Sequence, residues 1–325
     1  MSLELIYDYL SEIRTSKMSN LITNPTIIDP SSTVAKAINT ILLKNSYDAF
    51  CVQNSSILAT NVRELIAAKD ITRMKVSPFL HKARTVSLND TIEKAAAIMS
   101  HYRTRAVPVF DGKTFSGVVE AKNVLKLLSG KDLKWIKANA IFTPTPVTVS
   151  STDPLSKAKS LMITKRFDHI PVIHKNKVRQ VLTSTHILQV INPHERISRN
   201  LIGVNKSLRF DAQVANLGSK RIPQCKTNDN LNVVIDAMLR NDASCCLVTL
   251  WGNLHGIIAY KDLFGLLESR IQSQVPAYVV GMPQDHRDSE IVKSKFSKII
   301  QRVRKVYPEI EEARAIIKQH HAKGQ

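Results

Sequence analysis

The sequence predicts an α/β (α+β) fold in which one unit, strand-helix-strand-strand-helix, occurs four times before a short strand-helix-strand extension. The first observation is that apolar residues opening a helix recur 58, 63 and 76 positions apart: Val34, Ile92, Leu155 and Leu231. The second is that a valine in a later apolar run follows each of them by 17 or 18 positions: Val52, Val109, Val172 and Val248. Spacing that is kept over four copies indicates an internal repeat.

The second copy illustrates the elements of one repeat. A β-like stretch ends in a polar turn, Thr85 to Asp90, whose side chains we expect to cap the first helix. Apolar residues then follow at helical spacing from Ile92 to Met99. The strands Ala106 to Val109 and Phe115 to Val119 come next, and Val124 opens a second helix. One such unit buries little surface, so the repeats are expected to pair.

The four copies in register resemble cystathionine-beta-synthase (CBS) domains, which occur in tandem pairs called Bateman modules. The resemblance covers roughly residues 20 to 270 and depends on Ala106 to Val109 with Gly117 to Val119, His169 to Val172 with Val181 to Thr183, and Gly256 to Ile258 before Asp262. It implies an N-terminal helix at 1–17, a first module at 18–130, a second module at 131–273 and a basic extension at 274–325.

In nucleotide-binding CBS domains the second strand leads into a Ser or Thr and, three residues later, an Asp that holds ribose at a helix N-terminus. No copy here has both residues. The resemblance implies that Asp262 holds ribose, that Thr183 supplies the hydroxyl and that His186 lies near a phosphate, while Thr183 and Asp262 as simple helix caps are the alternative. Glu64 could replace the acid in the first copy, with Asn61 as a cap.

Basic residues precede two of the apolar strands, where the family places phosphate contacts. Charge-assisted hydrogen bonds to phosphate suit such side chains, although a solvated edge is the alternative. These residues are Arg103, Arg105, Arg166 and His169. In the second copy Glu120 occupies the Ser/Thr position and is expected to repel phosphate.

Charge points to polyanionic partners. The 325 residues include 46 Lys and Arg against 27 Asp and Glu, a formal net charge of +19. The basic residues concentrate in the connection between the third and fourth copies and in the expected helix of the extension. We expect RNA contacts from Arg196, Arg199, Lys206, Arg209, Lys293, Lys295, Lys298, Arg302, Arg304 and Lys305.

The extension resembles the first half of the fold of hibernation-promoting factors, which bind ribosomes. The likeness depends on a basic helix that ends at Tyr307-Pro308 and on a strand at Ala313 to Ile317. The strands and second helix that complete that fold are missing. An amphipathic dimerisation element, and hence a homodimer, is the alternative.

Several classes of function are disfavoured. The sequence has no G-x-G-x-x-G, Walker loop, H-E-x-x-H or nucleophile elbow, so we expect no enzyme and no metal. It has no apolar run of the roughly 18 residues that cross a bilayer, and its N-terminus is unlike a signal peptide, so we expect a cytoplasmic protein without a membrane partner.

The predicted function is a non-enzymatic CBS protein that binds an adenosine nucleotide (AMP, ADP or ATP) or S-adenosylmethionine. It serves as a scaffold for structured RNA, most directly the ribosome, in hibernation or translation regulation. The alternative is an AMP/ATP-sensing regulatory subunit of a kinase or other enzyme, without RNA binding.

Overall fold

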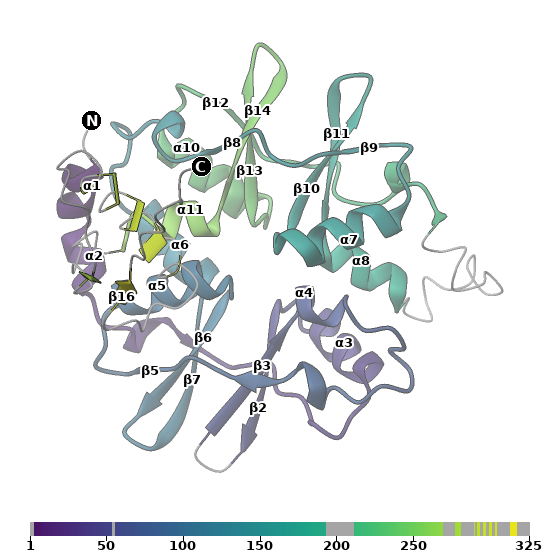
Figure 1. Ribbon diagram of the computed structural model, residues 1–325, viewed down its shortest axis with the longest axis horizontal. Coiled ribbons are helices and arrows are strands. Elements are labelled where there is room, and N and C mark those ends of the chain that lie inside the picture. The colour runs from purple at the N-terminus through teal and green to yellow at the C-terminus, as the bar shows by residue number, and fades with distance from the viewer. Residues whose placement is uncertain are drawn as a thin grey trace, which may run out of the picture. The chain divides into compact units, whose positions relative to one another are not determined.

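The computed structural model describes residues 3–53, 56–192, 211–268, 277–280 and 313–316, and eight helical positions between 289 and 303. The chain divides into two compact units, Met1–Glu268 and Ser269–Gln325. The first unit contains all four predicted repeats (Figure 1).

Each repeat has the predicted order of elements. The first consists of α3 (Val34–Leu43), β2 (Asp48–Gln53), β3 (Ser56–Asn61) and α4 (Val62–Leu65). The second consists of β5 (Val86–Ser87), α5 (Ile92–Tyr102), β6 (Ala106–Asp111), β7 (Thr114–Glu120) and α6 (Ala121–Ser129). The third consists of β9 (Val149–Ser150), α7 (Leu155–Lys165), β10 (His169–His174), β11 (Lys177–Thr183) and α8 (Ser184–Ile191). The fourth consists of β12 (Gln224–Lys226), α10 (Leu231–Arg240), β13 (Cys245–Leu250), β14 (Asn253–Ala259) and α11 (Tyr260–Phe264).

The opening strands pair in parallel with the first strand of their own hairpin, as β5 does with β6 and β9 with β10. In the first repeat this strand is reduced to one bridge, Ile27 to Phe50. The prediction that the polar turns cap the helices is partly wrong. Asp90, Asp153 and Asp229 instead accept hydrogen bonds at 2.7–2.8 Å from backbone N–H groups three residues earlier, which closes the turn.

Repeats pair through short arms that cross to the neighbouring hairpin. The arm strands are β1 (Ile22–Thr23), which pairs with β7, β4 (His81–Lys82), which pairs with β3, and β8 (Thr143–Pro144), which pairs with β14. The β8 arm needs a glycine opposite it, because a Cβ at Gly256 would lie 2.1 Å from Cδ2 of Phe142. The arm thereby positions residues 143–147 beside the start of α11.

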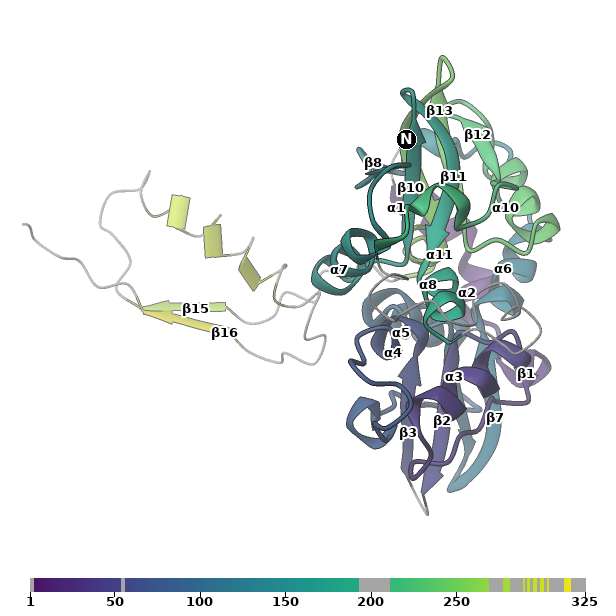
Figure 2. The same cartoon turned by 90° about the vertical axis from the view of Figure 1, so that its right-hand side faces the viewer.

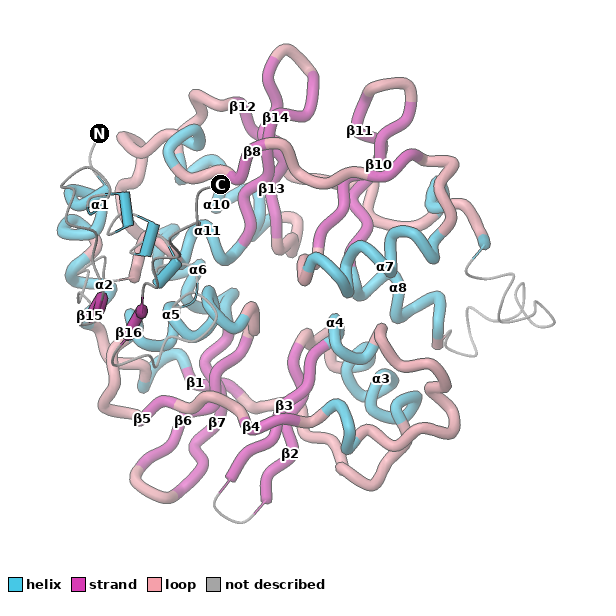
Figure 3. Tube along the Cα trace, viewed as in Figure 1, coloured by secondary structure: helices cyan, strands magenta, loops and turns pink. Residues whose placement is uncertain are grey.

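Packing inside the first unit joins the repeats in two ways. Sheet residues of repeats 1 and 2 form one small cluster (Phe50, Ile57, Ala106 and Val118), and sheet residues of repeats 3 and 4 form another (Val181, Cys245, Leu247 and Ile257). The helices of repeats 1 and 3 share a large core, as do those of repeats 2 and 4. The hairpins of repeats 1 and 2 therefore point away from those of repeats 3 and 4, with helices between them (Figure 3).

The N-terminal segment forms α1 (Leu3–Tyr9) and α2 (Ser11–Thr15) rather than one helix. Ile6, Leu10 and Ile13 are buried in the core of repeats 2 and 4, as their shared face predicts.

The second unit has the predicted strand-helix-strand order. Strand β15 (Ala277–Val280) pairs in parallel with β16 (Ala313–Ile316), which lies alongside it in Figure 2. Among the ten predicted RNA contacts of the whole chain only Lys295, in this unit, is described, and it is exposed. The other nine, Arg196, Arg199, Lys206, Arg209, Lys293, Lys298, Arg302, Arg304 and Lys305, lie outside the described residues.

Candidate functional site

Residues at one equivalent position of the four repeats lie close together in the middle of the first unit. Asp48, Arg105, Asp168 and Ser244 each stand four residues before the valine that defines the repeat spacing. The backbone N–H of Arg105 donates to Asp48 at 2.7 Å, and its guanidinium meets Asp168 at 3.1 Å. Ser244 lies 2.7 Å from Nε2 of His169. Residues of all four repeats are thus close together, because helices of repeats 1 and 3 and helices of repeats 2 and 4 pack on one another.

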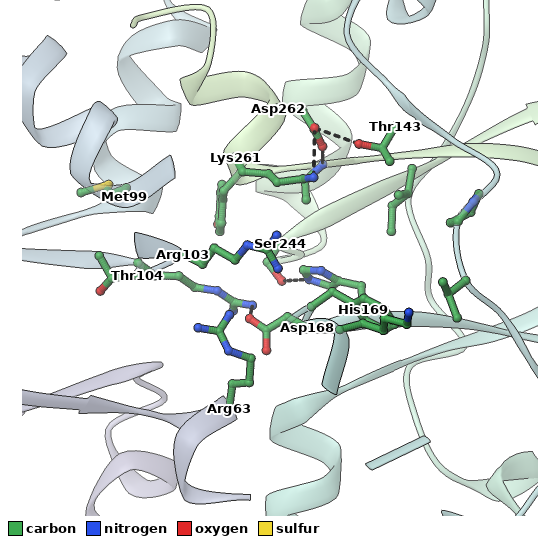
Figure 4. Close-up of a pocket in the computed structure, with 18 of the residues that line it drawn as sticks. Arg63, Met99, Arg103, Thr104, Thr143, Asp168, His169, Ser244, Lys261 and Asp262 are labelled. Atoms are coloured by element: carbon green, nitrogen blue, oxygen red, sulfur yellow. Dashed lines mark hydrogen bonds and ion pairs between the residues drawn. The ribbon is translucent and has the colours of Figure 1, made fainter. Parts of the chain in front are cut away.

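A cavity of about 260 Å³ lies beside this convergence and is lined by residues from all four repeats. Its apolar side includes Val147 from the β8 arm and Ile257 from β14. Its polar side contains the start of α11, where Lys261 and Asp262 lie, and Arg63 and Arg103 extend toward it from other repeats (Figure 4).

Asp262 is fixed at the N-terminus of α11. One carboxylate oxygen accepts a hydrogen bond from the backbone N–H of Ala259 at 2.8 Å, and the other accepts one from Oγ1 of Thr143 at 3.1 Å. Burial raises the pKa of Asp262, although the nearby charges of Lys261 and Arg103 act in the opposite direction. Each carboxylate oxygen keeps one further acceptor position for a ligand in the cavity.

Two arginines occupy an unusual backbone conformation, and one of them, Arg103, lines the cavity, whereas Arg166 does not. Arg103 ends α5 and Arg166 ends α7, and both have φ of 55°. The first and fourth repeats place Asn45 and Asp242 in this left-handed conformation, which short polar side chains tolerate better than arginine does. Backbone strain of this kind concentrates at functional sites.

The arginines carry uncompensated charge. Burial lowers the pKa of Arg103, and repulsion from Arg63 and Arg166 lowers it further. Within the described part of the chain none of these three side chains forms an ion pair. Arg63 and Arg103 line the cavity and repel each other, which favours an anion between them.

Arg105, in contrast, is already paired. Its guanidinium lies 3.9 Å above the ring of Tyr47 as well as contacting Asp168. Asp168 also accepts a hydrogen bond from Oγ of Ser184. Burial is the largest influence on the pKa of Asp168 and raises it, but the charge of Arg105 and the hydrogen bond from Ser184, with smaller neighbouring effects, together leave the pKa below its ordinary value.

His169 lines the cavity as a neutral group. Burial, together with the charge of Arg105, lowers its pKa to about 4. It can therefore exchange a hydrogen bond with a ligand near neutral pH, but it adds no positive charge to the site.

The remaining predicted residues lie outside the cavity and serve local structure. Thr183 accepts from the backbone N–H of His186 at 3.4 Å, and Nδ1 of His186 accepts from the backbone N–H of Thr183 at 3.1 Å. Asn61 caps α4 by accepting from the backbone N–H of Glu64 at 3.1 Å. Glu64 in turn meets Thr60 and His81, each at 3.3 Å. These are the helix-end roles that the capping alternative describes.

Sequence reasoning missed several residues of the cavity. Asp168 and Ser244 could have been found, because they share with Arg105 a fixed distance from the repeat valine. Arg63 and Thr143 could not, because packing of α4 against α8 and pairing of β8 with β14 place them.

A second, more polar cavity of about 280 Å³ lies on the other side of Arg105. Thr26, Lys44, Asp48, Glu120 and Lys122 line parts of it. Arg105, Ser244 and Tyr260 line both cavities. Burial raises the pKa of Asp48 to about 7.

Two kinds of feature are absent from the described residues. These residues contain no group of three or more His, Cys, Asp or Glu side chains placed to hold a metal ion. No described helix combines the length and apolar character needed to cross a membrane. All four cysteines are buried thiols.

The fold and the repeats define the class of protein: the chain contains CBS domains. The CBS domain family model matches residues 68–130 and 138–193. These stretches contain the second and third of the four repeats in the structure, so the predicted CBS fold is confirmed, whereas the likeness to hibernation-promoting factors stays a prediction.

Two solved structures share the fold at low sequence identity. Protein MJ1225 of Methanocaldococcus jannaschii, described as a proposed archaeal homolog of g-AMPK, superposes with a TM-score of 0.69 at 15% identity. The match covers 77% of this chain and 99% of that one. An uncharacterized conserved protein of Pyrococcus horikoshii superposes with a TM-score of 0.54 at 18% identity, over 78% of this chain and all of that one.

A curated relative adds a partial match in sequence. It is an uncharacterized 33.4 kDa protein in the ribosomal RNA operon of Thermofilum pendens, 21% identical over 147 residues. That match spans 45% of this chain and about half the length of the relative, 48%.

Proposed function

We propose that this protein is a regulatory, non-enzymatic CBS protein that binds an adenosine-containing ligand in the cavity beside Asp262. One observation carries the proposal: a fixed carboxylate at a helix N-terminus and arginines without ion-pair partners line the same cavity. A carboxylate can accept both hydroxyls of a ribose, and guanidinium groups bind phosphate.

The lining fits the three parts of a nucleotide. The ribose would donate its hydroxyls to Asp262, and the base would lie against Val147 and Ile257. Phosphates would extend toward Arg103 and Arg63. Arg103 is near enough for its charge to lower the pKa of Asp262, so both groups act on one ligand. AMP, ADP and ATP suit this lining, and S-adenosylmethionine, which carries no phosphate, suits only the ribose end.

A thermal-shift titration tests the proposal. A ligand at 100 times its dissociation constant stabilises the folded state by about 2.7 kcal/mol. We expect adenosine nucleotides to raise the unfolding temperature of the wild type and of Asp236→Asn, a charge-matched control on exposed α10. The Asp262→Asn variant should show little shift. An unfolding temperature that no adenosine compound raises would refute ligand binding.

Binding to structured RNA, most directly the ribosome, is a second proposed function. The observation that favours it is the net charge of +19. Contacts to phosphates release counterions, so log affinity should fall with log salt by about 0.7 to 0.9 per contact. Native lysate centrifuged at low and high salt tests it: co-sedimentation with ribosomes only at low salt supports RNA binding. A protein that never pellets with ribosomes but co-purifies with a kinase would favour the alternative regulatory subunit.

A further inference from the structure

We propose that Asp168 is an internal competitor for the ligand's phosphate, and that it sets how strongly the cavity prefers phosphate-bearing ligands. The inference rests on the proposed nucleotide site and adds a residue that determines its specificity. In the ligand-free protein the carboxylate of Asp168 forms an ion pair with Arg105, the one cavity-lining arginine that already has an acidic partner.

The two acidic residues of the cavity differ in their partners and in their positions. Asp262 and Asp168 are the two carboxylates that line it. Asp262 accepts hydrogen bonds from a backbone N–H and the Thr143 hydroxyl, has the Lys261 ammonium 3.8 Å from one oxygen, and faces the expected ribose. Asp168 is held by Arg105 and Ser184 and is only 11% exposed in its side chain. It therefore stands as a buried negative charge at the phosphate end.

Asp168 is ionised under ordinary conditions, because its ion pair with Arg105 and its hydrogen bond from Ser184 help to hold its pKa below the usual range against the opposing effect of burial. An incoming phosphate is attracted by Arg63 and Arg103 but repelled by Asp168. Two unit charges a few ångströms apart inside a protein change an affinity by about a hundred-fold before screening. After screening by the other charges we expect a net effect of about ten-fold.

Arg105 stays in the cavity when its acidic partner is neutralised. Its guanidinium stacks on Tyr47, and its backbone N–H is bonded to Asp48. The Asp168→Asn change keeps the shape of the side chain and leaves an oxygen that Ser184 can still donate to. The guanidinium of Arg105 then becomes available to a ligand phosphate.

The pair also links two parts of the fold. Arg105 precedes β6 in the second repeat, and Asp168 precedes β10 in the third. When a ligand phosphate binds Arg105, the ion pair between Arg105 and Asp168 breaks. An ion pair between Arg105 and the ligand replaces it. Ligand phosphate would thereby act on the contact between the two predicted modules.

Calorimetric titration of the full chain tests the proposal with adenosine, AMP, ATP and inorganic tripolyphosphate. We expect Asp168→Asn to tighten ATP and tripolyphosphate by about ten-fold, AMP by less, and adenosine not at all. Asp153→Asn is the matched control, because it removes one carboxylate from the same repeat at the opposite end of α7 and outside the cavity. It should leave all four affinities within about two-fold.

Other outcomes overturn the proposal. Equal changes for adenosine and ATP would show that Asp168 only holds the fold, and an unchanged affinity for ATP would show that it does not compete. Should Asp168→Asn unfold at 25 °C by circular dichroism, Arg105→Met is used instead: weaker tripolyphosphate binding is expected, and unchanged binding refutes the idea. Wild-type binding to tripolyphosphate but to no adenosine compound would refute the proposed nucleotide function while still testing Asp168.

Discussion

Ala259 precedes α11 at the repeat position that Thr183 occupies before α8. The two residues have almost the same backbone conformation, φ −121° and ψ 175° for Ala259 against φ −116° and ψ 163° for Thr183. Thr183 caps its helix through its hydroxyl, whereas α11 has no side-chain cap at this residue. Ala259 is half-buried and borders the cavity, so a larger side chain has space on that side.

The change Ala259→Thr should therefore stabilise the protein. A Thr cap in place of Ala contributes about 1 kcal/mol to the free energy of unfolding. For a domain of this size that corresponds to a rise of about 2 °C in the unfolding temperature. Urea denaturation followed by circular dichroism measures the change, and the slope with urea should stay the same. The reverse change Thr183→Ala should lose a similar amount.

The same hydroxyl would stand three residues before Asp262, as in the nucleotide-binding members of the family. We expect Ala259→Thr to tighten adenosine ligands several-fold, about 1 kcal/mol for one hydrogen bond. An Ala259→Thr variant that is less stable than the wild type would refute the capping argument. A variant that is more stable but binds adenosine ligands no more tightly would refute the argument for a hydrogen bond to the ligand.

Three further predictions concern other parts of the molecule. Gly256→Ala should destabilise the fold and weaken adenosine ligands together, because its Cβ would strike Phe142 and displace the β8 arm; unchanged urea midpoints would contradict this. Asp48 has its pKa raised to about 7, so the folded state holds its proton more tightly than the unfolded state and stability should fall as pH rises from about 4 to 7. Asp48→Asn should flatten that fall in urea midpoints measured across the range, and an identical profile would show that Asp48 is not its cause. Deleting residues 276–325 should leave the circular dichroism spectrum of the repeats intact and weaken co-sedimentation with ribosomes; full association of the truncated chain would exclude a role for the extension.

The sequence predicted the repeats well because each is a local pattern. Helix periodicity, short apolar strands and turn residues act over fewer than 20 positions, and their spacing survives in all four copies. The same locality explains the error over the helix caps. A turn aspartate can bond a backbone group on either side, and three of them bond the N–H three residues earlier.

The cavity was predicted only in part. Of the predicted residues, Asp262, Arg103, Arg105 and His169 line it, and their contact with a nucleotide stays a prediction. The others do not line it: Thr183, His186, Arg166, Asn61 and Glu64. The spacing of the repeats along the sequence does not indicate which repeats border an open cavity. That depends on how an arm from one repeat crosses the hairpin of another.

What the sequence by itself determined is the unit: its elements, their order and the positions that meet in every copy, because these follow from local propensity and regular spacing. What only the tertiary structure decided is which charges face one another. Arg105 of the second repeat meets Asp168 of the third, and Arg63 of the first approaches Arg103 of the second. These charges meet because two helix cores join repeats 1 with 3 and 2 with 4, while two sheet clusters join repeats 1 with 2 and 3 with 4. Charge acts through space, so the balance between compensated and uncompensated arginines appears only once the four repeats are packed together.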